Sequence, residues 1–232
     1  MFRAHNFFVF ALLFSAAAFP CWASQESPLA TVMEVSGGAE VLRPSSLRWI
    51  PLEKMTSIQS GSKIRTDDKG STQLFFEKDL ETAVKLDKNS ELSFPAGKPL
   101  TVFLEKGRLF VLREEAATGF FEVRTRHLRM RLGLGGCILD VSAKGLRIRM
   151  FGGEASLSSH GALAEGYQFS GHFMGKKTEV RKTRMIYRDT LDWQAWVRDW
   201  YEIKDDFFAD KLEKEMGFRT FWRVARRRSS GY

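Results

Sequence analysis

Cysteine is almost absent from this chain of 232 residues, which contains only Cys21 and Cys137. Cys21 lies in an apolar N-terminal leader, so removal of that leader leaves one cysteine and excludes an internal disulfide. Histidine is also scarce, and the three histidines that follow the leader lack the spacings of zinc motifs. The sequence therefore predicts a protein without a metal or other cofactor, stabilised by its apolar core.

Long apolar runs are also missing, except for one near the N-terminus. Arg3 precedes the apolar segment Phe7–Ala18, and a small residue, Ala23, stands before Ser24. This pattern is typical of a secretory signal peptide over residues 1–23, cleaved between Ala23 and Ser24, with an uncleaved anchor as the alternative. The segment is short for a spanning helix, and no later stretch is long enough to cross a bilayer. We therefore expect a soluble protein exported to the periplasm.

Negative charge is in the minority. The 36 Lys and Arg residues outnumber the 28 Asp and Glu residues, for a formal net charge of +8. One positive charge, Arg3, belongs to the leader, which leaves about +7 in the mature chain. A basic exported protein favours anionic partners such as phospholipid headgroups, lipopolysaccharide phosphates or acidic glycans. Nucleic acid is not an expected partner outside the cytoplasm.

Alternation of apolar and polar residues is the pattern that dominates the middle of the chain. In the stretch Ile58–Phe76, Leu74 and Phe76 alternate with polar residues after a polar turn cluster. This pattern predicts two strands joined as a hairpin. Thr31–Val35 and Ala39–Arg43 flank a pair of glycines and predict another hairpin.

Similar apolar pairs recur along residues 24–175, separated by turns rich in Gly, Asp, Asn and Pro. Strands about eight to twelve residues apart are typical of all-β folds, and no window of helical period interrupts them. The sequence therefore predicts an all-β domain over residues 24–175, either a sandwich or a solenoid-like stack of short strands. Gly133–Gly136 are interpreted as a turn between two strands, and Cys137 as a small buried core residue.

The end of the chain has a different pattern. Residues 176–188 are basic and poorly patterned, and are interpreted as a linker. Residues 189–217 have a helical period with one apolar stripe, and residues 218–232 form a basic tail. The stripe, a candidate docking surface, consists of Trp193, Trp196, Trp200, Ile203 and Phe207. We expect it to dock onto the β-domain or a partner helix, with a membrane interface or stacking on sugar rings as alternatives.

Four arginines alternate with apolar residues in two predicted strands: Arg129, Arg131, Arg147 and Arg149. Because side chains alternate between the faces of a strand, the two arginines of each pair share one face. If the two strands are neighbours, four guanidinium groups form an anion-binding cradle for a phosphate or a carboxylate. A solvated basic face is the alternative.

Several short motifs occur in one order along residues 31–171. They are Val35-Ser36-Gly37, Arg48–Leu52 (RWIPL), Ser60–Thr66 (SGSKIRT), Gly70–Leu74 (GSTQL), Leu86–Leu92 (LDKNSEL), Leu104–Leu109 (LEKGRL) and Phe121–Thr125 (FEVRT). In this order they resemble the FecR domain, the exported β-rich module of bacterial iron-signalling regulators and other envelope proteins. The resemblance implies a β-rich binding or relay module. The chain departs from the family at Gly136-Cys137, where Gly-Thr is usual.

Together these features predict an exported, non-catalytic FecR-like protein that serves as a binding scaffold or signalling module in the bacterial envelope. A module that binds peptidoglycan or another glycan is the first alternative. An envelope hydrolase or transpeptidase acting through Cys137 is the second, although the Ser-His-Gly-Cys motif of such transpeptidases is missing. The expected partner is an envelope protein or an anionic glycan or lipid, including peripheral membrane contact through the C-terminal helix and tail.

Overall fold

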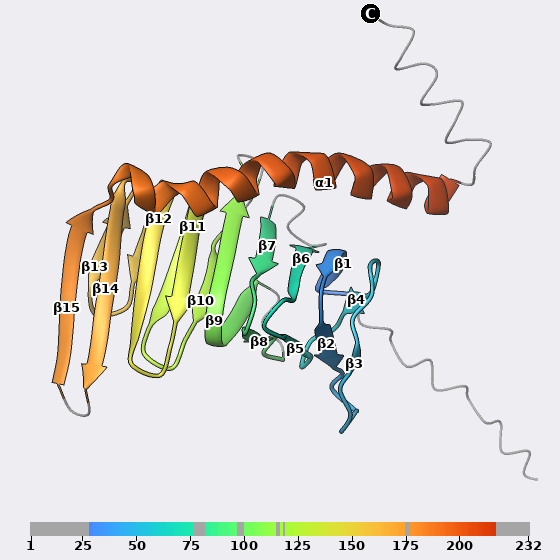
Figure 1. Cartoon of the computed structure of the whole chain (residues 1–232), viewed down its shortest axis with the longest axis horizontal. Helices are drawn as coiled ribbons and strands as arrows, with labels where there is room; N and C mark the ends of the chain where they lie inside the picture. The colour runs from blue at the N-terminus through green and yellow to red at the C-terminus, as the bar shows by residue number, and fades with distance from the viewer. Residues whose placement is uncertain are drawn as a thin grey trace, which may run out of the picture.

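The computed structural model describes residues 28–76, 82–96, 100–114, 117, 119–174 and 177–216. They form one extended β-structure with a long helix lying across it (Figure 1). The predicted fold class, an all-β domain followed by a C-terminal helix, is confirmed. The predicted signal peptide, its cleavage site between Ala23 and Ser24, and the basic tail 218–232 lie outside the described residues.

Most strands are short, and three of them are much longer than the rest. In chain order they are β1 (Ala30–Ser36), β2 (Ala39–Leu42), β3 (Ile50–Pro51), β4 (Ser57–Ile58), β5 (Lys63–Thr66), β6 (Ser71–Phe76), β7 (Thr82–Leu86), β8 (Glu91–Ser93), β9 (Thr101–Arg113), β10 (Phe121–Arg124), β11 (Arg129–Val141), β12 (Gly145–Leu157), β13 (Gly161–Ala164), β14 (Tyr167–Met174) and β15 (Lys177–Arg184). A 3-10 helix, η1 (Tyr187–Thr190), leads into helix α1 (Leu191–Met216). In the part of the chain that the structure describes, no helix has the length and apolar character needed to cross a membrane.

The sheet encloses one apolar core because its long strands change partners along their length. Residues 107–113 of β9 lie beside β7 and β11, whereas residues 101–106 lie beside β8 and β10. Gly107, with a φ of +94°, stands where the partners change. Buried side chains of both parts, such as Leu104 and Leu109, belong to the same cluster, which we call the main core.

The stretch Ile58–Phe76 is not the hairpin that its pattern predicted. β5 pairs with β2 and β8, while β6 pairs with β1 and β7, so the turn between them carries the chain from one part of the sheet to the other. β1 and β2, the second predicted hairpin, likewise do not pair with each other. Alternation shows which residues face the core, and it is the same for a hairpin and for two strands that face each other across a core.

The turns at the end of these strands stack on one another. The backbone N–H of Asp67 donates to the carbonyl of Gly38 at 2.9 Å. The hydroxyl of Thr66 donates to the carbonyl of Asp87 at 2.6 Å and accepts from the N–H of Ser90 at 3.0 Å. Thr66 and Ser90, both in the FecR-like motifs, therefore hold successive turns in register, as in a solenoid.

The basic stretch 176–188 is not the linker that was predicted. Residues 177–184 form β15, which pairs with β14 along its whole length. Its residues from Glu179 to Arg184 are all exposed, so this part of the strand has no buried face. Without a buried face there is no apolar alternation, and the pattern used to predict strands fails.

Helix α1 covers the outer face of part of the sheet (Figure 1). A second apolar cluster, which we call the helix interface, lies between them and consists of Met33, Phe75, Ala83, Phe110, Ile138, Trp196 and Trp200. The strands beneath the helix are therefore buried on both faces. In β6, for example, Phe75 faces the helix and Phe76 faces the main core.

Candidate functional site

The aromatic stripe of the C-terminal helix docks onto the protein's own sheet. Trp196 and Trp200 are each 2% exposed, and both lie in the helix interface. Two further members of the stripe pack against the same cluster, Trp193 and Ile203. The side chain of Phe207 lies outside the described part. The central rings of the stripe are thus used within the chain and are not available for stacking on a sugar.

The glycines of β11 shape the surface on which the helix rests. The ring of Trp193 lies so close to Gly136 that a Cβ atom there would be 2.1 Å from it. The same ring stacks on Phe151 of β12 with centroids 4.9 Å apart. Gly133–Gly136 therefore do not form the predicted turn between strands but lie inside β11, where its register with β12 shifts. The missing side chain lets a tryptophan approach the backbone.

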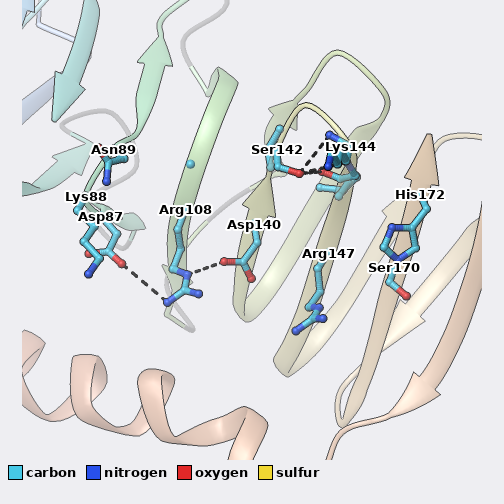
Figure 2. Close-up of a pocket in the computed structure, with 14 residues that line it drawn as sticks. Asp87, Lys88, Asn89, Arg108, Asp140, Ser142, Lys144, Arg147, Ser170 and His172 are labelled. Carbon is cyan, nitrogen blue, oxygen red and sulfur yellow. Dashed lines mark hydrogen bonds and ion pairs between the residues drawn. The ribbon is translucent and has the colours of Figure 1, made fainter. Parts of the chain in front are cut away.

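Beside the first turn of the helix, a row of polar side chains crosses four strands (Figure 2). Arg108 of β9 lies directly opposite Asp140 of β11 in the strand register, and Asp140 lies opposite Arg147 of β12. Arg147 in turn lies opposite Ser170 of β14. Because cross-strand partners share a face, the row lies on one face of the sheet. Ile138, two residues before Asp140, belongs to the helix interface, so this is the face that carries α1.

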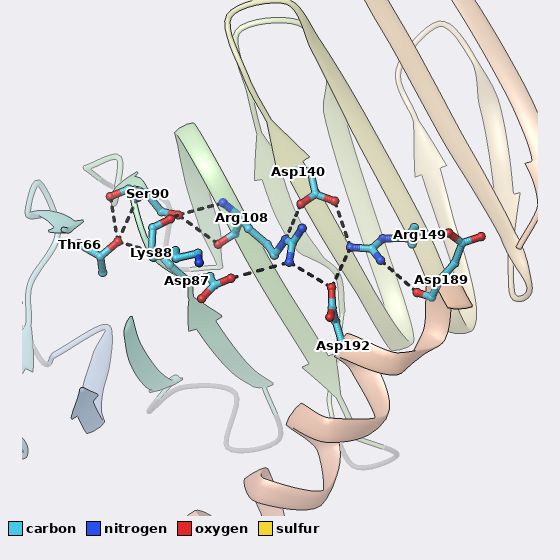
Figure 3. Close-up of polar contacts among 9 residues, drawn as sticks. All are labelled: Thr66, Asp87, Lys88, Ser90, Arg108, Asp140, Arg149, Asp189 and Asp192. Atoms are coloured by element: carbon cyan, nitrogen blue, oxygen red, sulfur yellow. Dashed lines mark hydrogen bonds and ion pairs between the residues drawn. The ribbon is translucent and has the colours of Figure 1, made fainter. Parts of the chain in front are cut away.

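A buried arginine ties the beginning of the helix to this row (Figure 3). The Arg149 guanidinium donates to Asp140 Oδ2 at 3.1 Å and to the carbonyl of Asp189 at 3.0 Å. Its nitrogen Nη2 lies 3.9 Å from the carboxylate of Asp192, a residue in the first turn of α1. Arg108 also contacts Asp140, and it reaches Asp192 at 3.1 Å. These charges form a network that joins the sheet to the helix.

The charge of Arg108 is compensated within this network. Burial disfavours its charged form, but the hydrogen bond to Asp140 and the charges of Asp140, Asp192 and Asp87 outweigh burial and raise the pKa of Arg108. The Arg149 side chain is only 6% exposed. Neither arginine is therefore well placed to pair with an anion from outside.

A groove of about 630 Å³ opens at the turn end of the same row (Figure 2). Its charged lining consists of Lys88, Arg108, Lys144, Arg147, Asp87 and Asp140. Both carboxylates are engaged by Arg108. Among the residues that the structure describes, the side chains of Lys88, Lys144 and Arg147 make no hydrogen bond or ion pair. The groove thus presents three uncompensated positive charges, and Ser170 and His172 add hydrogen-bonding groups on its β14 side.

The four arginines that were predicted to form one cradle do not come together. Arg147 lines the groove and Arg149 is buried under the helix, whereas Arg129 and Arg131 begin β11. Ile138, which is paired with Arg149, is seven residues after Arg131, a distance of roughly 20 Å along a strand. The condition for the cradle is met, because β11 and β12 are neighbours. The prediction of a cradle was still wrong, because the strands are antiparallel, which places the starts of β11 and β12 at opposite ends.

Arg131 forms an ion pair with a residue of another strand, β10. Glu122 of β10 accepts from Arg131 at 3.0 Å and from Arg124 at 2.5 Å, and its side chain is 10% exposed. Burial raises the pKa of Glu122, but the two hydrogen bonds and the nearby positive charges outweigh burial and lower it. Arg129 lines a separate, smaller groove of about 380 Å³ together with His127. Burial, aided by the positive charge of Arg126, lowers the pKa of His127.

Cys137 is a core residue, as its pattern predicted. Its side chain is fully buried in the main core. Burial raises the pKa of its thiol, so the nucleophilic thiolate is strongly disfavoured. Within the described ranges, no group of three His, Cys, Asp or Glu side chains is placed to hold a metal ion.

Sequence reasoning missed two of the groove cations, Lys88 and Lys144. Both lie in polar turns that the sequence did indicate, Asp87–Asn89 and Lys144-Gly145. Their convergence depends on turns from distant strands lying at the same end of the sheet. Alternation along a strand carries no information about that end-to-end alignment.

Comparison with known proteins gives few matches. No protein-family model matches the chain, and no curated protein sequence matches it. Two crystal structures of a "putative anti-sigma factor" from Parabacteroides distasonis ATCC 8503, at 1.65 and 2.50 Å resolution, are similar to it with a TM-score of 0.46 and 17% identity. Each similarity covers 57% of this chain and 64% or 63% of the other, which is less than two thirds of its length. A similarity of this size carries no argument about function.

Proposed function

We propose that this protein is a FecR-like, non-enzymatic binding module of the bacterial cell envelope that recognises an anionic group in the groove beside α1. One contrast carries the proposal. Arg108 and Arg149 are compensated by aspartates, whereas Lys88, Lys144 and Arg147 line a groove without a partner among the described residues.

The arrangement of these cations fits a phosphate or carboxylate. Arg147 offers the planar fork that binds either group through two hydrogen bonds, and the two lysines add compact positive charges. All three stand on strands or tight turns of a sheet whose turns are fixed in register. The backbone is thus fixed before a ligand arrives, and binding has to order only the side chains.

The cell envelope supplies ligands of this chemistry. The predicted signal peptide over residues 1–23 directs the chain to the periplasm, where phospholipid headgroups, lipopolysaccharide phosphates and acidic glycans carry these groups. The ordered FecR-like motifs support assignment to an exported β-rich module. Their Thr66 and Ser90 side chains bridge stacked turns, a structural role consistent with such a module.

Binding to three separate probes tests the proposal. The mature protein is mixed with phosphatidylglycerol vesicles, with lipopolysaccharide and with purified peptidoglycan, and the bound fraction is measured. The triple variant Lys88→Gln, Lys144→Gln, Arg147→Gln is compared with a control that loses the same charge elsewhere, Arg43→Gln, Arg48→Gln, Lys69→Gln. These three control residues are exposed and lie outside the groove.

We expect the groove variant to lose at least about tenfold in affinity for the probe that binds, since charged hydrogen bonds are removed. The control should stay close to the unmodified protein, and added salt should weaken binding. Equal losses of affinity in both variants would show that only net charge matters. A protein that binds none of the three probes would contradict the proposal.

Export has its own test. The proposal requires the chain purified from cells to begin at Ser24 and to fractionate with the periplasm. Protein that retains Met1 and stays in the cytoplasm would contradict the location but not the chemistry of the groove.

A further inference from the structure

β15 is an exposed edge strand of the sheet. It pairs with β14 over all eight of its residues, and it stands at one end of the strand order (Figure 1). Other edge strands among the described residues are shorter, with four residues in β13 and two in β4. A long edge strand carries unpaired backbone groups that can pair with another strand.

The backbone groups on the open side can be identified from the register. The N–H of Met185 donates to the carbonyl of Gly166, in line with the pairing of Arg184 with Tyr167. In an antiparallel pair, every second residue exchanges its hydrogen bonds with the neighbouring strand. The odd-numbered residues of β15 therefore bond to β14. The even-numbered residues direct N–H and C=O outward: Thr178, Val180, Lys182 and Arg184.

Most of the features that keep an edge strand from pairing with another chain are missing from β15. It contains no proline, and its register with β14 is continuous, without a bulge. Val180, in the middle of the strand, is 36% exposed. Only charge remains as a protection, so the placement of charges decides which strand can pair here.

The charges of β15 are arranged for a second copy of the same strand. We infer that two molecules associate through antiparallel pairing of β15, with Val180 of one copy opposite Val180 of the other. In this register Glu179 of each copy faces Arg181 of the other copy, while the Lys182 ammonium keeps its hydrogen bonds to the carbonyls of His160 and Ala162 within its own copy. Opposite charges that face each other across a strand pair stabilise it.

Other two-fold registers place like charges together. A centre on Glu179 opposes two glutamates, a centre on Arg181 opposes two arginines, and a centre on Lys182 opposes two lysines. Of the registers centred on residues 179 to 182, the one centred on Val180 alone avoids this repulsion. A centre on Thr178 also avoids like charges, because it places Glu179 opposite Lys177, but it joins a much shorter part of β15. The register centred on Val180 is therefore the favoured one for pairing of the strand with itself.

Glu179 and Arg181 are accessible for this contact. Their side chains are 49% and 71% exposed, and they form an ion pair within the strand, with Arg181 Nε donating to Glu179 Oε1 at 2.8 Å. Two copies would join two such pairs into one cluster of alternating charge. The carboxylates and guanidinium groups of that cluster are at the surface in each copy, so the cost of desolvation is small.

Sedimentation of the mature protein over a range of concentrations tests the inference. The unmodified protein should show a monomer–dimer equilibrium. Glu179→Arg and Arg181→Glu should each weaken dimerisation by about tenfold, because each replaces two attractive contacts with two repulsive ones. The double variant Glu179→Arg, Arg181→Glu should restore it, because it recreates both attractive pairs. Glu165→Arg, a charge reversal at an exposed residue outside the strand, should have no effect.

A second variant probes the backbone. Val180→Pro removes an outward N–H without removing a bond to β14, so it should abolish the dimer while thermal unfolding shows that the protein still folds. The inference is overturned if the unmodified protein is monomeric at every concentration, if it dimerises regardless of these changes, or if the double variant fails to dimerise. A monomer that instead captures an added acidic extended peptide through this strand would identify a different occupant and would also overturn it.

Discussion

Arg149 shows how one buried side chain can fix the place of a whole helix. Its guanidinium bridges Asp140 in the sheet and the backbone of Asp189 just before α1. The pairing compensates a charge that would be costly to bury alone. Removal of Arg149 loses its contacts with the sheet and the helix start, while Asp140 keeps its ion pair with Arg108.

Replacing Arg149 with alanine should therefore lower the free energy of unfolding by about 1.5–3 kcal/mol, because buried charged hydrogen bonds are lost. Arg147, two residues away in the same strand, is exposed and has no partner among the described residues. Its replacement by alanine should change stability by no more than about 0.5 kcal/mol. Urea denaturation of both variants measures the difference, and equal losses would contradict the role given to Arg149.

Glu122 should make stability depend on pH. Its folded-state pKa is lowered, so its contribution to stability is complete above its unfolded pKa, near 4.5, and is lost as the pH falls through the folded value. Glu122→Gln should destabilise the protein at neutral pH and flatten this acid part of the profile. Urea unfolding at a series of pH values tests the prediction, with the exposed Glu165→Gln as control. Profiles of the same shape for Glu122→Gln and the unmodified protein would speak against it.

The packing of helix α1 on the sheet depends on the absence of a side chain at Gly136. Trp193 occupies the space that a Cβ atom of Gly136 would need, whereas the nearest atom to a Cβ at Gly133 would be 3.9 Å away. Gly136→Ala should therefore displace the helix, and Gly133→Ala should not.

Hydrogen exchange measures this displacement directly. Amides of the first turns of α1 should exchange faster in Gly136→Ala, because undocking exposes a helix held by its apolar stripe. Exchange in Gly133→Ala should match the unmodified protein. Unchanged exchange in Gly136→Ala would mean that Trp193 does not position the helix.

The helix itself was predictable, and its seat was partly so. The spacing of Trp193, Trp196 and Trp200 placed them on one stripe, and the helix begins within two residues of the expected boundary. The surface on which α1 packs has a signal in the sequence. Adjacent apolar residues, such as Phe75-Phe76 and Ile138-Leu139, indicate strands that are buried on both faces. β15 could not be found by alternation because its described side chains are all exposed.

At the scale of the whole molecule, the sequence was informative about class and poor in topology. Alternation and turn residues predicted an all-β domain, which the structure confirms. The pairing of strands was wrong for β5 and β6, because the turn between them crosses the core. The arginine cradle failed for a related reason: residues that share a face can still lie at opposite ends of antiparallel strands.

The groove is the product of this topology. Lys88 is distant in sequence from Lys144 and Arg147, and all three line one groove where the turn between β7 and β8 aligns with the turn between β11 and β12. Arg108 and Asp140 line the same groove but belong to the charge network beneath α1, where they compensate each other. A site of this kind belongs to the assembled sheet and to no single motif.

A titration of the isotope-labelled mature protein with inorganic pyrophosphate, followed by NMR, tests directly whether the groove binds an anion. Saturable shifts should be confined to the amides around Lys88, Lys144 and Arg147, and they should be lost in the variant with all three replaced by glutamine. Shifts spread evenly over the basic surface, or saturable binding that survives in that variant, would contradict anion binding in the groove.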